Sequence, residues 1–382
     1  MQGQDQQGYK FDPLGSLAWK CAIHESVLAL PDPAPRGILR AGLFDANGQH
    51  IAAADCWTTE NRPATQAPDP ANRNALGWLP GLQLYGGILS GHFGHLICEG
   101  TARLWALDQP RAVPDGLVYF SRDPTKNGRI LRRAKGLLAA LGIDAPCSII
   151  DQPTRLEAVL LAPQAFGTDA LLTGTPEFRH FMRARLAGRT PAPQRERRLY
   201  LSRGRLPRRR GVLIGERRLE ALLSEQGFEI YHPESHSLSE QVAAYRAAAG
   251  IAATEGSPLH LVGFAAARGT PVVMLERRKG GPAPCIADSL TRFLLRSPAL
   301  VPALSGGWRL ESGRQSVLYH VLDLPAVHAA LLDRGMVEGP AWPPLDPDAI
   351  RAELSDIEVE TGGTLTRLAD TSPNLDIGEP AA

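Results

Sequence analysis

The strongest constraint on the fold is a regular alternation of strand-like and helix-like segments between residues 198 and 276. Strands are predicted at "RLYLSR" (198–203), "FEIYHP" (228–233), "IAAT" (251–254) and "TPVVMLE" (270–276). Helical patterns lie between them at 215–227, 237–250 and 257–269. Such alternation is typical of βα units, in which a parallel sheet has helices on both faces. We therefore expect a doubly wound α/β domain here.

The 382 residues are too many for one ordinary core, so we expect two domains. The best interior linker is "RTPAPQRER" (189–197), which is rich in proline and charge. The predicted division is an N-terminal α/β domain over 1–190 and a second domain over 191–345. A C-terminal segment over 346–382 adds one short helix (346–358) and a polar tail.

The first domain has a weaker pattern. We expect a loose arm over 1–35, a hairpin with a type I′ turn at Asn47-Gly48 within 37–57, and a polar loop over 58–80. A helix is predicted from His92 to Leu107. The remaining predicted elements are strands at 116–122, 148–151 and 156–162 and helices at 130–143 and 175–188.

Composition excludes several classes of protein. The net charge of +1 at pH 7 gives no overall field that would attract nucleic acid or a membrane surface. The five cysteines lie far apart without a CxxC pair, which argues against a zinc ribbon or a disulfide scaffold. No signal peptide and no run of about 18 apolar residues is present. We expect a cytoplasmic protein, which a lipid-linked substrate would bring to the inner face of the membrane.

Ligands of open parallel sheets bind beyond the carboxyl ends of the strands. Arg203 and Arg205 follow the first strand of the second domain, within the basic stretch "SRGRLPRRRG" (202–211). Arginine matches phosphate oxygens with a two-pronged fork, so Arg203 is a candidate for binding phosphate or a nucleotide. The other reading of the basic stretch is a solvated loop, which we favour for residues 208–210.

A second candidate site follows the third strand, in "ATEGSPLH" (253–260). Gly256 allows a close approach to the backbone, Ser257 suits a helix N-cap and Pro258 suits the first helical position. Such a helix start favours an anion. Glu255 directly precedes this turn, where an acid would repel an anion unless its side chain points another way, and His260 would support the site or pack in the core.

A third group of polar side chains lies in the first domain, in "SGHFGHLICEGTARLW" (90–105). His95 and Glu99 are four residues apart, so they share a helix face, and His92 lies one turn earlier. One reading is a histidine base oriented by a carboxylate. The alternatives are an incomplete zinc site and a structural histidine beside an exposed acid.

Taken in order, "HFGHLICEGTARLWAL" (92–107) and the segment from "RRLYLSR" to "GTPVVML" (197–275) resemble glycosyltransferase family 61. This family includes bacterial capsular-polysaccharide biosynthesis proteins and plant and animal sugar transferases. The resemblance implies two Rossmann-like domains facing across a cleft, the GT-B architecture. It also implies inverting transfer from a nucleotide-diphosphate sugar to a glycan hydroxyl, without a cofactor or a required metal.

By position, the resemblance implies that Arg203 meets the phosphates and that Gly256 and Ser257 form the turn facing the diphosphate. It places Glu240 and Gln241 near the donor pocket, and Glu255 would there point toward sugar hydroxyls or act as a base. Glu216 corresponds to a family glutamate for which a structural role is one reading. The chain departs from the family at Gly215, Glu255 and Leu261, where family members have Asn, His and Asn, so the donor's identity cannot be transferred.

The expected mechanism needs a base, and His95 is the first candidate, followed by His92, with Glu255 as a competitor. Arg203 and the helix start at Ser257 would neutralise the leaving diphosphate. Two other classes stay open at this point. One is an epimerase-type enzyme acting on nucleotide sugars, and the other is a nucleic-acid binder using residues 202–211.

Overall fold

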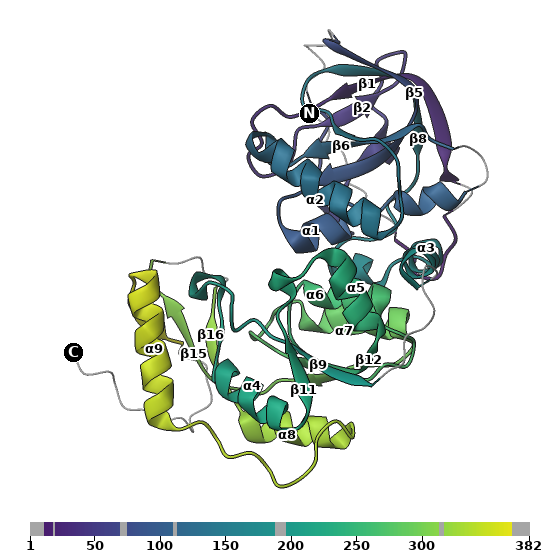
Figure 1. Ribbon diagram of the computed structural model, residues 1–382. Helices are drawn as coiled ribbons and strands as arrows, with labels where there is room; N and C mark the ends of the chain where they lie inside the picture. The colour runs from purple at the N-terminus through teal and green to yellow at the C-terminus, as the bar shows by residue number, and fades with distance from the viewer. Residues whose placement is uncertain are drawn as a thin grey trace. The chain divides into compact units, whose positions relative to one another are not determined.

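The computed structural model describes residues 11–17, 20–68, 75–109, 113–187, 196–312 and 317–368. Contacts within the chain divide it into two compact units, Met1–Pro191 and Ala192–Ala382. Both are of the mixed α/β class, and each has its own sheet (Figure 1). None of the helices in the described part of the chain combines the length and the hydropathy that a membrane span requires.

Unit 1 is built on a six-stranded mixed sheet with the order β2-β1-β8-β5-β6-β7. β8, β5, β6 and β7 run parallel to one another, whereas β1 is antiparallel to both of its neighbours. The strands are β1 (Ala22–Leu30), β2 (Gly42–Phe44), β5 (Gly77–Leu89), β6 (Gly116–Ser121), β7 (Cys147–Ile149) and β8 (Thr154–Leu161). A small separate ribbon pairs β3 (Trp57–Thr59) with β4 (Arg62–Pro63).

Two strands of this sheet are absent from the sequence-based prediction. The arm expected over 1–35 contains β1, whose last residues, Val27–Leu30, are buried. The longest strand, β5, begins inside the segment expected to be a loop over 58–80. Pro80 and Gly81 make this strand look like a loop in the sequence. The strand accommodates them because its pairing with β8 shifts register between Leu79 and Leu82.

The helices of unit 1 follow its strands. They are α1 (Phe93–Cys98), α2 (Asn127–Ala140) and α3 (Pro176–Ala187). The helix expected from His92 to Leu107 is interrupted after α1, and the 3-10 helix η3 (Leu104–Asp108) follows the break. Gly100 allows this break, because the chain passes so close to α1 that a Cβ at Gly100 would lie 2.4 Å from the carbonyl oxygen of Leu96.

The turn expected at Asn47-Gly48 is present but is not type I′. A bond from Gly48 N to Asp45 O closes it, and the Asp45 carboxylate accepts from the amides of Asn47 and Gln49. Gly48 has a positive φ of 77° whereas Asn47 has none, and type I′ requires both. The return chain forms only an isolated bridge between Phe44 and His50.

Unit 2 contains a five-stranded, fully parallel sheet with the order β11-β9-β12-β13-β14. Taken along the chain, this is the 2-1-3-4-5 order of doubly wound folds. The strands are β9 (Arg197–Leu201), β11 (Phe228–Tyr231), β12 (Ala248–Thr254), β13 (Val272–Leu275) and β14 (Ala299–Val301). The predicted βα alternation is thus confirmed for this unit.

Helices cover both faces of this sheet (Figure 1). One face packs on α4 and α8, whose leucines share a core with Tyr200, Ala252 and Val273. The other face is covered by α5, α6 and α7 (Figure 1). The helices are α4 (Glu216–Glu225), α5 (Leu238–Arg246), α6 (Pro258–Ala265), α7 (Ala283–Leu294) and α8 (Leu324–Asp333).

One boundary in unit 2 differs from the prediction. The helix expected over 237–250 ends with α5 at Arg246, and β12 begins at Ala248, three residues before the predicted strand. The run of small residues at 247–250 has no clear period, so periodicity cannot separate a helix end from a strand start. The pairing of β12 with β9 is irregular between Ala248 and Gly250, which marks the transition.

A second, four-stranded sheet completes unit 2 in the order β10-β16-β15-β17. Its strands are β10 (Leu213–Ile214), β15 (Leu304–Leu310), β16 (Tyr319–Leu322) and β17 (Leu365–Arg367). The helix expected over 346–358 is α9 (Pro347–Thr361), which packs on this sheet through Ile350 and Ile357. The C-terminal segment is therefore part of unit 2 rather than an appendage.

Candidate functional site

The strand order of unit 2 identifies the point where a ligand would bind. β9 and β12 are neighbours, but the chain leaves β9 toward β11 on one side and leaves β12 toward β13 on the other. Ligands of open α/β sheets bind outside the carboxyl ends of the strands at such a switch point. Ser202 and Arg203 follow β9 there, and Glu255, Gly256 and Ser257 follow β12.

Glu216, the first residue of α4, joins these two strand ends. Its Oε1 accepts from the backbone amide of Arg203 at 2.8 Å, from the Tyr200 hydroxyl at 3.0 Å and from Thr254 Oγ1 at 3.2 Å. Burial raises the pKa of this carboxyl, and the bond from the Arg203 amide opposes that effect. Glu216 is 2% exposed, so its role is to fix the turn after β9 rather than to meet a ligand.

The guanidinium of Arg203 lies beside the turn after β12. A Cβ placed on Gly256 would lie 3.3 Å from Arg203 Nη1, so the absence of a side chain at Gly256 leaves room for the arginine. Among the described residues, the guanidinium has no hydrogen bond and no ion pair. Burial lowers the pKa of Arg203, and the charges of Glu216 and Glu255 oppose this.

The turn itself offers two further donors. Ser257 occupies the N-cap position of α6 and Pro258 is the first helical residue, as predicted, although the Ser257 side chain makes no capping bond. The backbone amides of Gly256 and Ser257 donate to no acceptor in the described part of the chain. Within the described residues, an arginine without a counter-ion thus lies next to two unused amides at a helix N-terminus, an arrangement that suits an anion.

The contacts of the Glu255 side chain are with the segment after β13. Its side chain is 1% exposed, its Oε1 lies 3.4 Å from Arg278 Nε, and its Oε2 lies 3.4 Å from the amide nitrogen of Arg277. The carboxylate is therefore directed toward the segment after β13 and is paired there with a cation. This arrangement removes the conflict between an acid and an anion site that the sequence presents.

Two residues expected near the donor pocket make structural contacts. Glu240 forms a capping box with Ser237 at the start of α5. Gln241 is 6% exposed, and its Nε2 donates to the carbonyl oxygens of Pro233 at 2.8 Å and His236 at 3.1 Å. Both residues shape the loop after β11.

The other two predicted residues of unit 2 lie on either side of the switch point. Arg205 is exposed in the loop after β9. His260 is half-buried on the first turn of α6, where its amide bonds to the carbonyl oxygen of Ser257 at 3.2 Å.

In unit 1, the predicted pair of His95 and Glu99 is formed. His95 Nδ1 lies 2.8 Å from Glu99 Oε1. Glu99 is 5% exposed, whereas the His95 side chain is 43% exposed, so a buried carboxylate orients an accessible imidazole. The hydrogen bond from Glu99 is the largest influence on the pKa of His95 and raises it, while burial lowers it.

The pair lies beyond the carboxyl end of β5, because α1 begins four residues after that strand ends. The ring of His92 contacts that of His95 edge-on, with 5.3 Å between the centroids. A carboxylate at Nδ1 holds the neutral imidazole with its proton on that nitrogen and leaves Nε2 as the acceptor. This geometry suits a general base.

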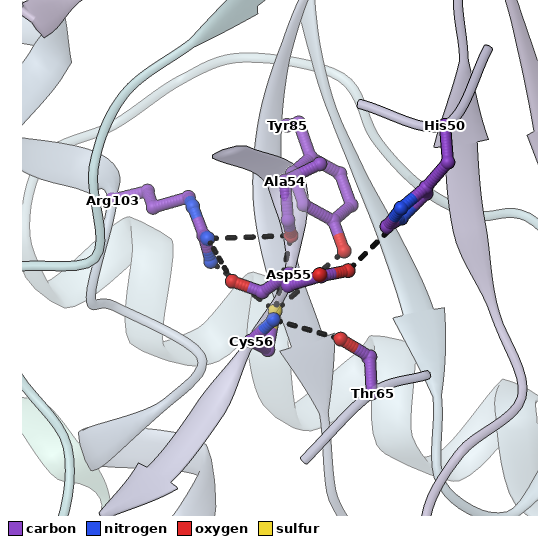
Figure 2. Close-up of polar contacts among 7 residues, drawn as sticks. All are labelled: His50, Ala54, Asp55, Cys56, Thr65, Tyr85 and Arg103. Atoms are coloured by element: carbon purple, nitrogen blue, oxygen red, sulfur yellow. Dashed lines mark hydrogen bonds and ion pairs between the residues drawn. The ribbon is translucent and has the colours of Figure 1, made fainter. Parts of the chain in front are cut away.

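Arg103, four residues after Glu99, is buried and bonded within the protein (Figure 2). It is 1% exposed, and its Nε donates to the Ala162 carbonyl at 2.9 Å. Its Nη1 lies 3.2 Å from Cys56 Sγ and its Nη2 donates to the Asp55 carbonyl at 2.8 Å. The guanidinium also lies over the Tyr85 ring. All its nitrogens are used inside the protein, so Arg103 is structural.

Sequence reasoning missed the basic residues after β13, Arg277 and Arg278. β13 pairs with β12 so that Leu275 lies opposite Thr254, which brings both segments to the same edge of the sheet. The signal was available, since "ERRKGG" follows a predicted strand as "SRGR" follows another.

Comparison with known protein families gives one assignment. Residues 93–273 match the model of the family described as Glycosyltransferase 61. The chain therefore contains a glycosyltransferase family 61 domain. The resemblance stated from the sequence is thereby confirmed, and the protein is a glycosyltransferase. A comparison with curated proteins finds no match.

The matched region of the glycosyltransferase runs from the start of α1 into β13. It includes the His95–Glu99 pair, Arg203, and the turn at Gly256, and it ends before Arg277. Within the described residues, no group of three or more His, Cys, Asp or Glu side chains is arranged to hold a metal ion.

Proposed function

We propose that this family 61 enzyme is an inverting glycosyltransferase that moves a sugar from a nucleotide-diphosphate donor to a hydroxyl of a glycan acceptor. The observation that carries this proposal is the anion site at the switch point of unit 2. There, Arg203 has no counter-ion within the described residues and lies next to the unused amides of Gly256 and Ser257. A diphosphate at this position supplies the missing negative charge.

The proposed chemistry is a single displacement at the anomeric carbon. His95 Nε2 takes the proton of the acceptor hydroxyl, and the acceptor oxygen forms the new bond to the anomeric carbon. The bond from that carbon to the phosphate oxygen breaks, and its electron pair leaves with the diphosphate. Arg203 and the two amides stabilise the charge that develops there. Attack opposite the leaving group inverts the anomeric configuration.

His95 suits the role of base better than its competitors. Its imidazole is accessible and oriented by Glu99. Glu255 is buried and paired with Arg278, so an acceptor would have to displace that pairing. It is His95, and not His92, whose imidazole Glu99 binds, while His92 contacts the His95 ring edge-on.

The family resemblance supports the further proposals on architecture, biological role and location. It includes a GT-B arrangement, in which the two units face each other across a cleft, because a base in one unit must reach a donor bound to the other. It also includes a role in surface or capsular polysaccharide synthesis in the cytoplasm, with peripheral membrane association when the acceptor is lipid-linked. We propose that no metal is required, because arginine and amide donors take the charge of the leaving group.

The test is a binding and product assay on the full chain. Uridine, guanosine, cytidine and thymidine diphosphates are screened for an increase in thermal stability, which a ligand of the folded state produces by mass action. The matching nucleotide sugars are then incubated with glycan acceptors, and the anomeric configuration of the product is read by NMR. Conversion of a nucleotide sugar without an acceptor would indicate an epimerase-type enzyme instead. No binding of any diphosphate would refute the proposal.

A further inference from the structure

Arg277 occupies a position at the anion site that its sequence context does not reveal. β13 ends at Leu275, which pairs with Thr254 at the end of β12. Glu276 and Arg277 therefore leave the sheet beside Glu255 and Gly256. Arg277 lies four residues beyond the region matched by the family.

The side chain of Arg277 is buried and has no partner among the residues that the structure describes. It is 8% exposed, its Nε is buried without an acceptor, and its guanidinium forms no hydrogen bond or ion pair with any described residue. Burial lowers the pKa of Arg277 to about 10, and repulsion from Arg203 is the next largest cause. A buried charge without a partner is costly and therefore rare in proteins.

Arg103 shows what a structural arginine looks like in the same protein. It is buried to a similar degree, yet its guanidinium is bound to backbone carbonyls and to Cys56 Sγ (Figure 2). Backbone acceptors can thus satisfy a buried arginine here. No such set of acceptors binds the guanidinium of Arg277 among the described residues.

The surroundings hold Arg277 in place through its backbone. Its carbonyl oxygen accepts from His320 Nδ1 of β16 at 3.0 Å, and its amide faces Glu255. A Cβ at Gly211, where φ is +75°, would lie 2.9 Å from Arg277 Nη1, so the side chain passes where only glycine leaves room. The protein thus fixes the residue and leaves its charged end unsatisfied.

We propose that Arg277 and Arg203 form a two-arginine clamp for the diphosphate of the donor. This inference rests on the proposed function and assigns a second phosphate-binding residue to the same site. Each guanidinium binds phosphate oxygens, and the bound anion removes the repulsion between the two cations. Glu255 is paired with Arg278, and its charge, which also acts on Arg203 and Arg277, cannot balance all three cations, so positive charge remains for the ligand to balance.

The experiment compares three variants of the full chain: Arg277→Met, Arg203→Met and, as a control, Arg268→Met. Arg268 is an exposed arginine that precedes β13, at the opposite end of the same strand. Calorimetry measures the affinity for the nucleoside diphosphate that stabilises the wild-type protein, and for its monophosphate. We expect Arg277→Met to weaken diphosphate binding by about ten- to a hundredfold, as for loss of charge-assisted hydrogen bonds. The control should bind as the wild type does.

A second readout separates a ligand-binding arginine from a structural one. Without ligand, Arg277→Met should unfold at the same temperature as the wild type or higher, because it removes an unpaired buried cation. Loss of stability without ligand would overturn the inference in favour of a structural role. Unchanged diphosphate affinity in Arg277→Met, with weakened affinity in Arg203→Met, would overturn it while the proposed function stands. Failure of the wild type to bind any nucleoside diphosphate would refute both.

Discussion

The carboxylate of Glu216 accepts the backbone amide of Arg203 at 2.8 Å and thereby holds the arginine at the end of β9. The same oxygen binds Thr254 at the end of β12. One buried acid thus sets the spacing between the two strand ends that form the anion site, although it is too buried to meet a ligand itself.

Replacing Glu216 should therefore weaken ligand binding from a distance. Glu216→Ala removes the acceptor of the Arg203 amide, and we expect weaker binding of the nucleoside diphosphate together with a loss of stability of about 1–3 kcal/mol. Glu216→Gln retains an acceptor oxygen and should keep more of the affinity. Calorimetry and urea denaturation measure the two effects. Equal diphosphate affinity in Glu216→Ala and the wild type would show that Arg203 needs no such support.

The pairing of His95 with Glu99 predicts the acid side of the pH–rate profile. A base must be neutral, so the rate should fall as the pH drops through the pKa of His95, which the Glu99 hydrogen bond raises above 6.5. Glu99→Gln removes the raising charge, and the midpoint of this acid limb should move to lower pH. The measurement is kcat/KM against pH with saturating donor.

Removing the imidazole tests the same assignment directly. His95→Ala should lower kcat by about 10²–10⁴-fold, the usual contribution of a general base. His180→Ala serves as the control, because His180 is an exposed histidine of α3 in the same unit. A normal turnover number in His95→Ala would transfer the role of base to another residue.

Gly256 leaves space for Arg203, so a methyl group there should disturb the anion site. The added Cβ of Gly256→Ala would lie 3.3 Å from Arg203 Nη1, which forces the guanidinium to shift. We expect a rise in the Kd for the nucleoside diphosphate with the fold retained. Gly136→Ala is the control, because a Cβ on this residue of α2 meets nothing within 4 Å. It should leave binding unchanged and stabilise the helix by about 0.5–1 kcal/mol.

Arg103 should behave as a stability residue. Arg103→Ala leaves the carbonyls of Asp55 and Ala162 without their donor and opens a cavity, so we expect a loss of about 3 kcal/mol or more. The change in the free energy of unfolding is measured by urea denaturation. Diphosphate affinity of the fraction that remains folded should equal that of the wild type, and a specific loss of affinity would contradict the structural role.

Chelation tests the proposed independence from metal ions. If Arg203 and the helix N-terminus stabilise the leaving diphosphate as proposed, activity should persist after dialysis against EDTA. The assay measures the release of nucleoside diphosphate with and without the chelator. Loss of activity that added Mg²⁺ or Mn²⁺ restores would refute this part of the proposal.

The sequence predicted unit 2 better than unit 1 for physical reasons. In the parallel sheet of unit 2, four of the five strands are short runs bounded by turn residues, so the βα alternation is visible without knowledge of the packing. β14 and the four-stranded sheet are absent from the sequence-based prediction. In unit 1, β5 carries a proline and a glycine at an irregular position, and the exposed half of β1 is polar. These two segments are identified as strands only by their hydrogen-bonded pairing with β8 in the folded protein.

In the candidate site, too, local patterns are predictable from the sequence and contacts between distant segments are not. The positions of Arg203, Gly256, Ser257 and the His95–Glu99 pair follow from local patterns, namely strand ends, a helix start and an i,i+4 spacing. The direction of the Glu255 side chain depends on its pairing with Arg278, a contact across two strands that no local pattern contains. The buried state of Arg277 likewise depends on Gly211 and His320, which are distant in sequence.

The four-stranded sheet described above has a consequence for the smallest functional piece of this enzyme. β10 belongs to that sheet although it lies in the connection between β9 and α4, and Arg208 in the same connection bonds to Asp356 and Glu360 of α9. His320, which holds the carbonyl of Arg277, lies on β16 of this sheet. Residues in the last third of the chain thus support the edge of the parallel sheet at which the proposed donor site lies. A protein shortened to residues 93–273 would keep the region that matches the family. It would lose β16 and α9, whose contacts hold Arg277 and the loop after β9 in position.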